Sequence, residues 1–336
     1  MSLYESLVEE QQKANSSGVI DFAHIYDKIA EHLKDHVHNK VVIGAASHGE
    51  GLLNNHGLKH VQEVIDWIAK LFEKGYCKPN LCELFLILMA AQVHDIGNIS
   101  GRKDHEKRIN EILSTCTEYG RLDGPTRYYI LAIAGAHGGK ALDGSKDTLS
   151  ELETLTQLRG FDIHPRALAS VLRMADELAD NCDRADVDMR VLDNIPEGND
   201  IYHRYSESIQ SVKLEGTTIS YKYSLTKDVI SRKFGKIEGD TVQKVYLYDE
   251  ILSRLLKTFC EMEYCCRNSR GYFNLDSISA SFTVFSDDFK RRMDQPFGIR
   301  LNYKGYPNSF KDISDVIEGP ILFESGQKMA EHFASC

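Results

Sequence analysis

The segment Leu81–Val93 constrains the fold more than any other part of the sequence. Because it is apolar on nearly every side, a helix formed by it has to be surrounded by other helices. The segment ends at His94-Asp95-Ile96-Gly97. Burying an aspartate is costly unless a cation or good hydrogen-bond donors meet it. An imidazole and a carboxylate side by side at the end of a buried helix therefore indicate a site for a divalent ion.

Further helices are expected around this one, over about the first 185 residues. Apolar residues recur at helical spacing from position 61 to 72, and Gly75 stands where that helix would end. Pro125 can open another helix that runs to His137, and Pro165 can open a fourth. The pattern predicts a helical bundle.

The hydrophobic pattern of the sequence changes beyond about residue 186, where strand-like segments appear. Residues 211–223 alternate with period two around a glycine-containing turn, which predicts a β-hairpin. Residues 242–266 have the pattern of a long amphipathic helix. Residues 278–285 and 299–303 are expected to be further strands.

These patterns predict an α+β chain. A helical domain is expected over residues 1–190, followed over residues 191–336 by a smaller α+β domain that has an antiparallel sheet and no assigned role. A chain of 336 residues is long enough for two domains.

The charge balance, the cysteines and the apolar runs of the sequence limit which partners and which cellular location we expect. Lys and Arg number 40 against 50 Asp and Glu, a net charge of -10 that disfavours membranes and nucleic acid as partners, with single-stranded RNA left open. The eight cysteines form no C-x-x-C pair, and the first residues lack the features of a signal peptide. The longest apolar run, residues 84–91, is far short of the ~20 residues of a membrane span. We expect a soluble, cytoplasmic protein.

Further ligand-type residues stand at the other helices. His60 borders the apolar stripe of its helix, and His56 lies four residues earlier on the same face. His137 ends the third helix, and Asp176 lies in line with Leu172 on the inner side of the fourth. Metal sites in helical bundles are built in this way, from inward side chains of facing helices. By contrast, the four histidines of the first segment do not converge and indicate a solvated helix face: His24, His32, His36 and His38.

The ordered set of one His, a His-Asp pair and a later Asp resembles the HD-domain superfamily of metal-dependent phosphohydrolases. The resemblance is carried by the segments 60–64 (HVQEV), 94–97 (HDIG) and 172–178 (LRMADEL). It implies an all-helical HD-type bundle, and a divalent ion (Mn, Mg, Fe, Co, Ni or Zn) held by His60, His94, Asp95 and Asp176.

The resemblance also leaves a second ion open. His105 and His137 fall at the matching positions, and Asp95 would then bridge the two ions. The chain departs from the pattern here, because Ala136-His137 stands where dinuclear members often have a His-His pair.

Four residues are the candidates for catalysis. Asp95 holds the ion that activates the attacking water, and Arg173 stands one turn before Asp176, where it could meet a phosphate. Lys59 and His56 are candidates for holding substrate or donating a proton, although His56 could equally be a capping or surface residue. The cations Arg102, Lys103, Arg108 and Lys140 are open to a role in an anion pocket or to plain surface charge.

The function expected from the resemblance is hydrolysis of a phosphate ester or anhydride in a small, nucleotide-like substrate through metal-activated water. Two alternatives stay open: a regulatory nucleotide- or partner-binding module with a vestigial metal site, and an RNA-processing activity. Self-association as a homodimer is compatible with each of these functions.

Overall fold

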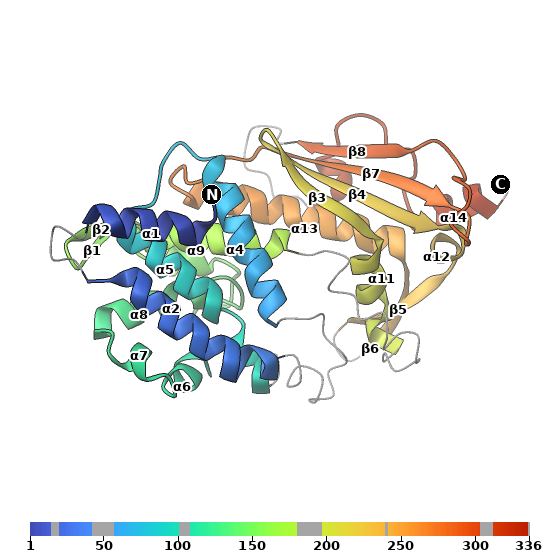
Figure 1. The fold of residues 1–336 in the computed structure, drawn as a ribbon. Coiled ribbons are helices and arrows are strands. Elements are labelled where there is room, and N and C mark those ends of the chain that lie inside the picture. Colours follow the sequence, from blue (N-terminus) through green and yellow to red (C-terminus); the bar gives the residue numbers. More distant parts are fainter. Residues whose placement is uncertain are drawn as a thin grey trace. The chain divides into compact units, whose positions relative to one another are not determined.

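The computed structural model describes residues 1–14, 20–41, 57–100, 108–179, 197–238, 241–302 and 312–334. They form an α+β fold whose N-terminal part is helical (Figure 1). The chain divides into two compact units: the first comprises Met1–Ala179 with Tyr264–Asn274, and the second Asp180–Glu263 with Leu275–Cys336. The boundary expected between residues 190 and 191 lies outside the described residues.

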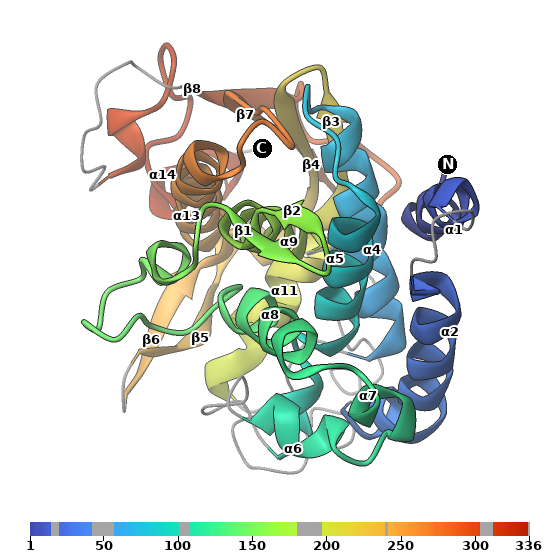
Figure 2. The ribbon, with the colours of Figure 1, turned by 90° about the vertical axis from the view of Figure 1, so that its left-hand side faces the viewer.

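Helix α5 (Leu81–Val93) is the centre of the first unit, and every one of its residues is buried. It contacts five other helices (Figures 1 and 2): α1 (Leu3–Ala14), α2 (Phe22–Leu33), α4 (Leu58–Glu73), α8 (Gly124–Gly135) and α9 (Pro165–Leu178). The stretch Leu81–Ile99 is long and apolar enough to cross a membrane, but 94% of its most apolar window is buried inside the protein. This helix is therefore accounted for as the core of the first unit.

Capping residues explain where the bundle helices begin. Asn80 and Glu83 cap α5 reciprocally, each side chain accepting a hydrogen bond from the other residue's backbone N–H. Asp123 accepts a hydrogen bond from the backbone of Thr126 at the start of α8. Pro165 opens α9. The four expected bundle helices are confirmed, and their ends place the ligand-type residues.

Short elements complete the first unit. Helices α6 (Ile109–Leu113) and α7 (Thr117–Gly120) precede α8, and a 3-10 turn (Thr148–Glu151) follows it. The two-stranded hairpin of β1 (Thr156–Leu158) and β2 (Phe161–Ile163) was not expected from the sequence. Its two-residue turn has φ +52° at Arg159 and +82° at Gly160, the left-handed conformation that tight hairpin turns require.

The expectation of a solvated face for the N-terminal histidines is wrong for His38. After α2 the helix continues as a π-helical turn (Lys34–His38), which turns His38 inward, where it is 1% exposed. The imidazole Nε2 of His38 donates to the side-chain oxygen of Gln92 at 3.0 Å, and the amide of Gln92 donates to the Tyr26 hydroxyl at 2.8 Å. Periodicity of 3.6 cannot show this inward turn because the π-helical turn shifts the register of the face.

The second unit holds a four-stranded sheet in the order β3-β4-β7-β8. Its strands are β3 (Ile209–Glu215), β4 (Thr218–Thr226), β7 (Ser277–Phe285) and β8 (Phe297–Asn302), which confirm the expected strands. The outer pairings are antiparallel as expected, but β4 and β7 pair in parallel. The long connection between them permits this, since a parallel pair needs a crossover rather than a tight turn.

That connection holds α12 (Lys227–Ser231), the hairpin of β5 (Lys233–Glu238) and β6 (Thr241–Tyr246), and helix α13 (Leu247–Asn268). The long helix expected from residue 242 therefore begins later, because residues 242–246 pair with β5 as a strand. Helices α11 (Asp200–Ser208) and α14 (Gly326–Ala334) also belong to the second unit. Stacked rings fill its core: Phe282 lies 5.2 Å from Tyr223 and 5.0 Å from Phe297 between ring centroids.

Residues 264–274 return to the first unit and are fixed there by buried Glu83. The carboxylate oxygen Oε1 of Glu83 accepts hydrogen bonds from the hydroxyl of Tyr272 at 2.7 Å and from Nδ1 of His164 at 2.8 Å. Burial, the charge of Glu83 and this hydrogen bond all raise the pKa of the Tyr272 hydroxyl. The backbone carbonyl of Gly271 accepts from the N–H groups of Tyr76 and Cys77.

We predict that Tyr272→Phe destabilises the first unit by about 1–3 kcal/mol, because Glu83 then keeps a buried charge with one donor fewer. The midpoint of urea denaturation, followed by circular dichroism, measures the change. Tyr76→Phe is the matched control, since Tyr76 is 80% exposed. Equal midpoints for the two variants would contradict the prediction.

Candidate metal centre

Five side chains from four parts of the first unit meet beside the end of α5. His60 comes from the first turn of α4, and His94 and Asp95 follow directly after α5. His137 follows α8, and Asp176 lies in the last turn of α9. All but Asp176 have nearly buried side chains, and the Asp176 side chain is 29% exposed.

Three of these residues form a group whose ligating atoms lie within 4.8 Å of one another: His60, His94 and Asp95. The Nε2 atoms of His60 and His94 lie 3.7 Å and 3.5 Å from the same Asp95 oxygen, Oδ2. Asp176 joins them, with Oδ1 at 3.1 Å from Nε2 of His60 and 3.8 Å from Nε2 of His94. This group could hold a metal ion.

His137 faces the other oxygen of Asp95. Its Nε2 lies 3.7 Å from Oδ1 of Asp95, and its ring lies 5.0 Å from that of His94 between centroids. Asp95 thus presents one oxygen to His60 and His94 and the other to His137.

The hydrogen bonds of the imidazoles test whether this site fits a cation. Nδ1 of His94 lies 2.9 Å from the carbonyl of Ala91, and Nδ1 of His137 lies 2.6 Å from the carbonyl of Ala134. A carbonyl only accepts, so both Nδ1 atoms carry the proton, and in the neutral ring Nε2 has a lone pair.

The lone pair of His94 faces a carboxylate oxygen of Asp95. Nε2 of His94 is buried and has no hydrogen-bond partner among the described residues. A lone pair and a carboxylate oxygen at 3.5 Å repel each other unless a cation lies between them. Metal-bound histidines likewise donate their second ring N–H to a carbonyl or carboxylate. The donor set therefore fits a divalent ion.

The electrostatics of the site favour the protonation states that bind metal. Burial, reinforced by the neighbouring His94, lowers the pKa of His137 and keeps its imidazole neutral. Burial alone would raise the pKa of Asp176, but the hydrogen bond from His60, together with the positive charge that His94 and His60 carry when protonated, outweighs it and lowers that pKa. Neutral imidazoles and ionised carboxylates are the ligand forms required.

The structure places the other candidate residues differently. Arg173 is buried, and its Nη1 donates to the Thr148 hydroxyl at 2.9 Å and to the Lys146 carbonyl at 3.2 Å. Lys59 and Lys140 are exposed, and Arg108 is half-buried. Four candidates lie outside the described residues: His56, Arg102, Lys103 and His105.

Sequence reasoning missed His38 as a polar residue close to this centre. Burial lowers the pKa of His38. The hydrogen bond to Gln92 raises it in part, and positive charge on His94 lowers it again. The available signal was Gln92, a polar residue within an otherwise apolar helix and two positions before His94.

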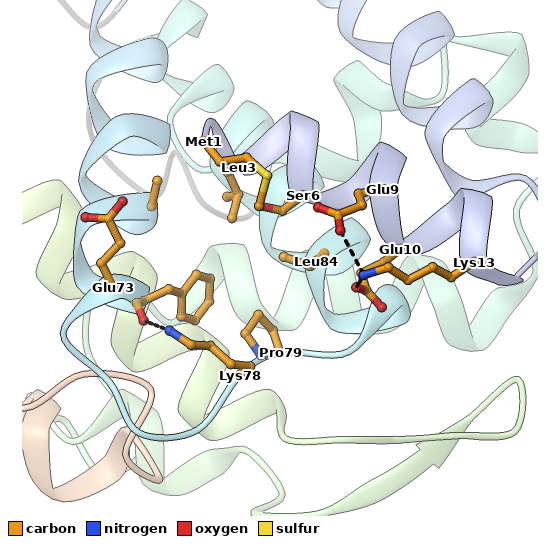
Figure 3. A pocket seen from close by; sticks show the side chains of 12 residues that line it. Met1, Leu3, Ser6, Glu9, Glu10, Lys13, Glu73, Lys78, Pro79 and Leu84 are labelled. Carbon is orange, nitrogen blue, oxygen red and sulfur yellow. Dashed lines mark hydrogen bonds and ion pairs between the residues drawn. The ribbon is translucent and has the colours of Figure 1, made fainter.

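A separate cavity of about 340 Å³ lies among α1, α4 and the start of α5 (Figure 3). Its two lysines are already engaged, Lys13 with Glu9 and Glu10 and Lys78 with the carbonyl of Phe72. None of the candidate ligands lines it.

Fold and site together define a helical unit that carries a histidine–aspartate group able to hold a metal ion. Residues 31–238, well over half of the chain, match the family model HD-CE, so the chain belongs to the HD-CE family. The match covers His60, His94, Asp95, His137 and Asp176. No curated protein matches the chain significantly, and neither does any solved structure.

We predict that Mn²⁺ raises the melting temperature of the protein and that His94→Ala removes most of this rise. A ligand at 100 times its Kd stabilises the folded state by about 2.7 kcal/mol, and His94 offers the buried lone pair that the ion needs. Differential scanning fluorimetry after chelator treatment measures the shift. His24→Ala, at an exposed histidine, should keep the full rise; an equal rise in His94→Ala would contradict the assignment.

Proposed function

We propose that the protein is a divalent-metal-dependent phosphohydrolase that acts on a nucleotide or a related phosphate ester or anhydride. The observation that carries the proposal is the meeting of the His60 and His94 imidazoles with the carboxylates of Asp95 and Asp176 inside the helical unit, an arrangement that a cation stabilises. The HD-type family to which the chain belongs supports it, as does the order of the ligand residues along the sequence.

His60, His94, Asp95 and Asp176 would hold the first ion. A second would be held by Asp95 together with His137, whose Nε2 lies 3.7 Å from Oδ1 of Asp95. His105 is proposed as a further ligand of this second ion. The mixed imidazole and carboxylate donors suit several first-row ions and Mg²⁺.

A bound divalent ion supplies an acidified water and neutralises charge on the phosphate oxygens. The chain's own residues orient these groups. The carbonyls of Ala91 and Ala134 fix the ring planes of His94 and His137, and the Asp95 carboxylate lies between them. Asp176 is the most exposed of the five side chains, so substrate and water approach from its side.

The substrate we propose is small and phosphorylated. With a net charge of -10 for the chain, an anion needs positive charge concentrated at the site, which the ions provide. Lys59, exposed next to His60, is the proposed side-chain contact for the substrate. A cytoplasmic location is part of the proposal; the six described cysteines form no disulfide with one another. The homodimer stays a prediction.

We predict that the purified protein releases phosphate or a nucleoside from some member of a nucleotide panel in the presence of Mn²⁺, Mg²⁺, Co²⁺, Ni²⁺ or Fe²⁺. Asp95→Ala should lower kcat/KM by more than about 100-fold, since even residues that only support metal ligands cost 10–100-fold when changed. Asp66→Asn, an exposed acid on α4, is the matched control and should leave the rate unchanged.

The rival functions have different outcomes in the same assay. A folded wild-type protein that binds metal but hydrolyses no member of the panel would favour the regulatory binding module. Salt-sensitive binding and cleavage of single-stranded RNA would favour the RNA-processing alternative. In either case the proposed substrate class would be wrong.

A further inference from the structure

A set of contacts leads from Tyr264, near the end of α13, to the turn that follows α8. The hydroxyl of Tyr264 donates to Oδ1 of Asp147 at 2.7 Å and accepts from the backbone N–H of Leu149 at 3.0 Å. Asp147 precedes the 3-10 turn Thr148–Glu151, but its side chain does not cap that turn. The Asp147 carboxylate accepts the hydrogen bond from Tyr264 instead.

Arg173 continues the set of contacts. Its guanidinium lies 4.9 Å from the centroid of the Tyr264 ring, and its Nη1 donates to the hydroxyl of Thr148 at 2.9 Å. The hydroxyl of Thr148 in turn donates to the carbonyl of Ala136 at 2.8 Å. Both side chains are nearly buried, with Arg173 7% and Thr148 6% exposed.

The last contact matters because Ala136 immediately precedes His137. The final carbonyls of a helix have no partner within that helix, so the hydroxyl of Thr148 satisfies one of them at the end of α8. It also fixes the peptide plane from which His137 extends. The Nδ1 of His137 is bound to the Ala134 carbonyl in the same turn.

We propose that Tyr264, Arg173 and Thr148 form a brace that positions His137 in the metal centre. The guanidinium of Arg173 acts within the brace, through Thr148, rather than as a contact to the phosphate. Tyr264 lies outside the 31–238 match to the family model, so the brace adds a C-terminal residue to the centre. The inference rests on the proposed metal centre but not on the proposed substrate.

The first test removes one hydroxyl and leaves the ring in place. Tyr264→Phe keeps the aromatic face beside Arg173 but loses the bonds to Asp147 and Leu149. We expect about tenfold weaker binding, by calorimetry, of the Mn²⁺ ion that His137 would hold, the size of effect that support residues of metal ligands have. We also expect a changed visible absorption spectrum of bound Co²⁺. Tyr128→Phe, at a tyrosine that is 58% exposed in the same unit, is the matched control and should bind as wild type.

The second test uses two substitutions of Thr148. Thr148→Val removes the hydroxyl at nearly constant volume and should weaken Mn²⁺ binding to a similar degree. Thr148→Ser keeps the hydroxyl and should restore both the affinity and the Co²⁺ spectrum. A purely structural role for Thr148 would instead make the smaller serine the worse of the two, because it leaves a cavity.

The outcomes separate this inference from the proposed function. Wild-type affinity and spectrum in both Tyr264→Phe and Thr148→Val, folded by circular dichroism, would overturn the brace. Absence of metal binding by the wild type would overturn the brace and the metal centre together. Metal binding that follows the expected pattern, without hydrolysis of any nucleotide, would support the brace and overturn only the phosphohydrolase.

Discussion

The first unit depends on the solution to one electrostatic problem, the burial of Asp95 at the end of an apolar helix. Its carboxylate lies beside His94 and His137, whose Nδ1 protons are already committed to backbone carbonyls. Without a cation, the Nε2 lone pair of His94 faces carboxylate oxygens of Asp95 and Asp176 at 3.5 Å and 3.8 Å. Such an arrangement is costly to keep in a folded protein unless it serves binding. The helices around α5 bring the ligands to this point, and the caps of those helices fix their ends.

The two oxygens of Asp95 organise the site further. Oδ2 faces His60 and His94, and Oδ1 faces His137. In the proposed function Asp95 would serve both ions of a pair, and paired ions suit displacement at phosphorus. Because His137 faces Oδ1, its position helps to determine the contacts on that side of Asp95. This dependence also explains why buried polar contacts gather behind the turn that carries this residue.

Much of the first unit could be predicted from the sequence because its signals are local. The apolar helix places His94 and Asp95 at its buried end. Helical periodicity places His60 and Asp176 on the inward faces of the neighbouring helices. His38 could not be placed, because a π-helical turn shifts its direction. Tyr264 could not be connected to His137 because 127 positions separate them along the chain and no periodic pattern links them. In the second unit, the parallel pairing of β4 with β7 depends on a crossover whose path leaves no local signal.

The position of residues 264–274 along the chain affects how the protein is made. They lie between two strands, β4 and β7, that pair directly with each other. Neither unit is therefore one continuous stretch of polypeptide. A nascent chain that has left the ribosome as far as Ala179 contains every residue proposed to bind metal, yet it lacks both tyrosines that fasten the returning segment to the bundle. Because that segment is part of the helical unit, a shortened chain that stops at the end of the HD-CE match would carry its proposed ligands without residues 264–274 of that unit.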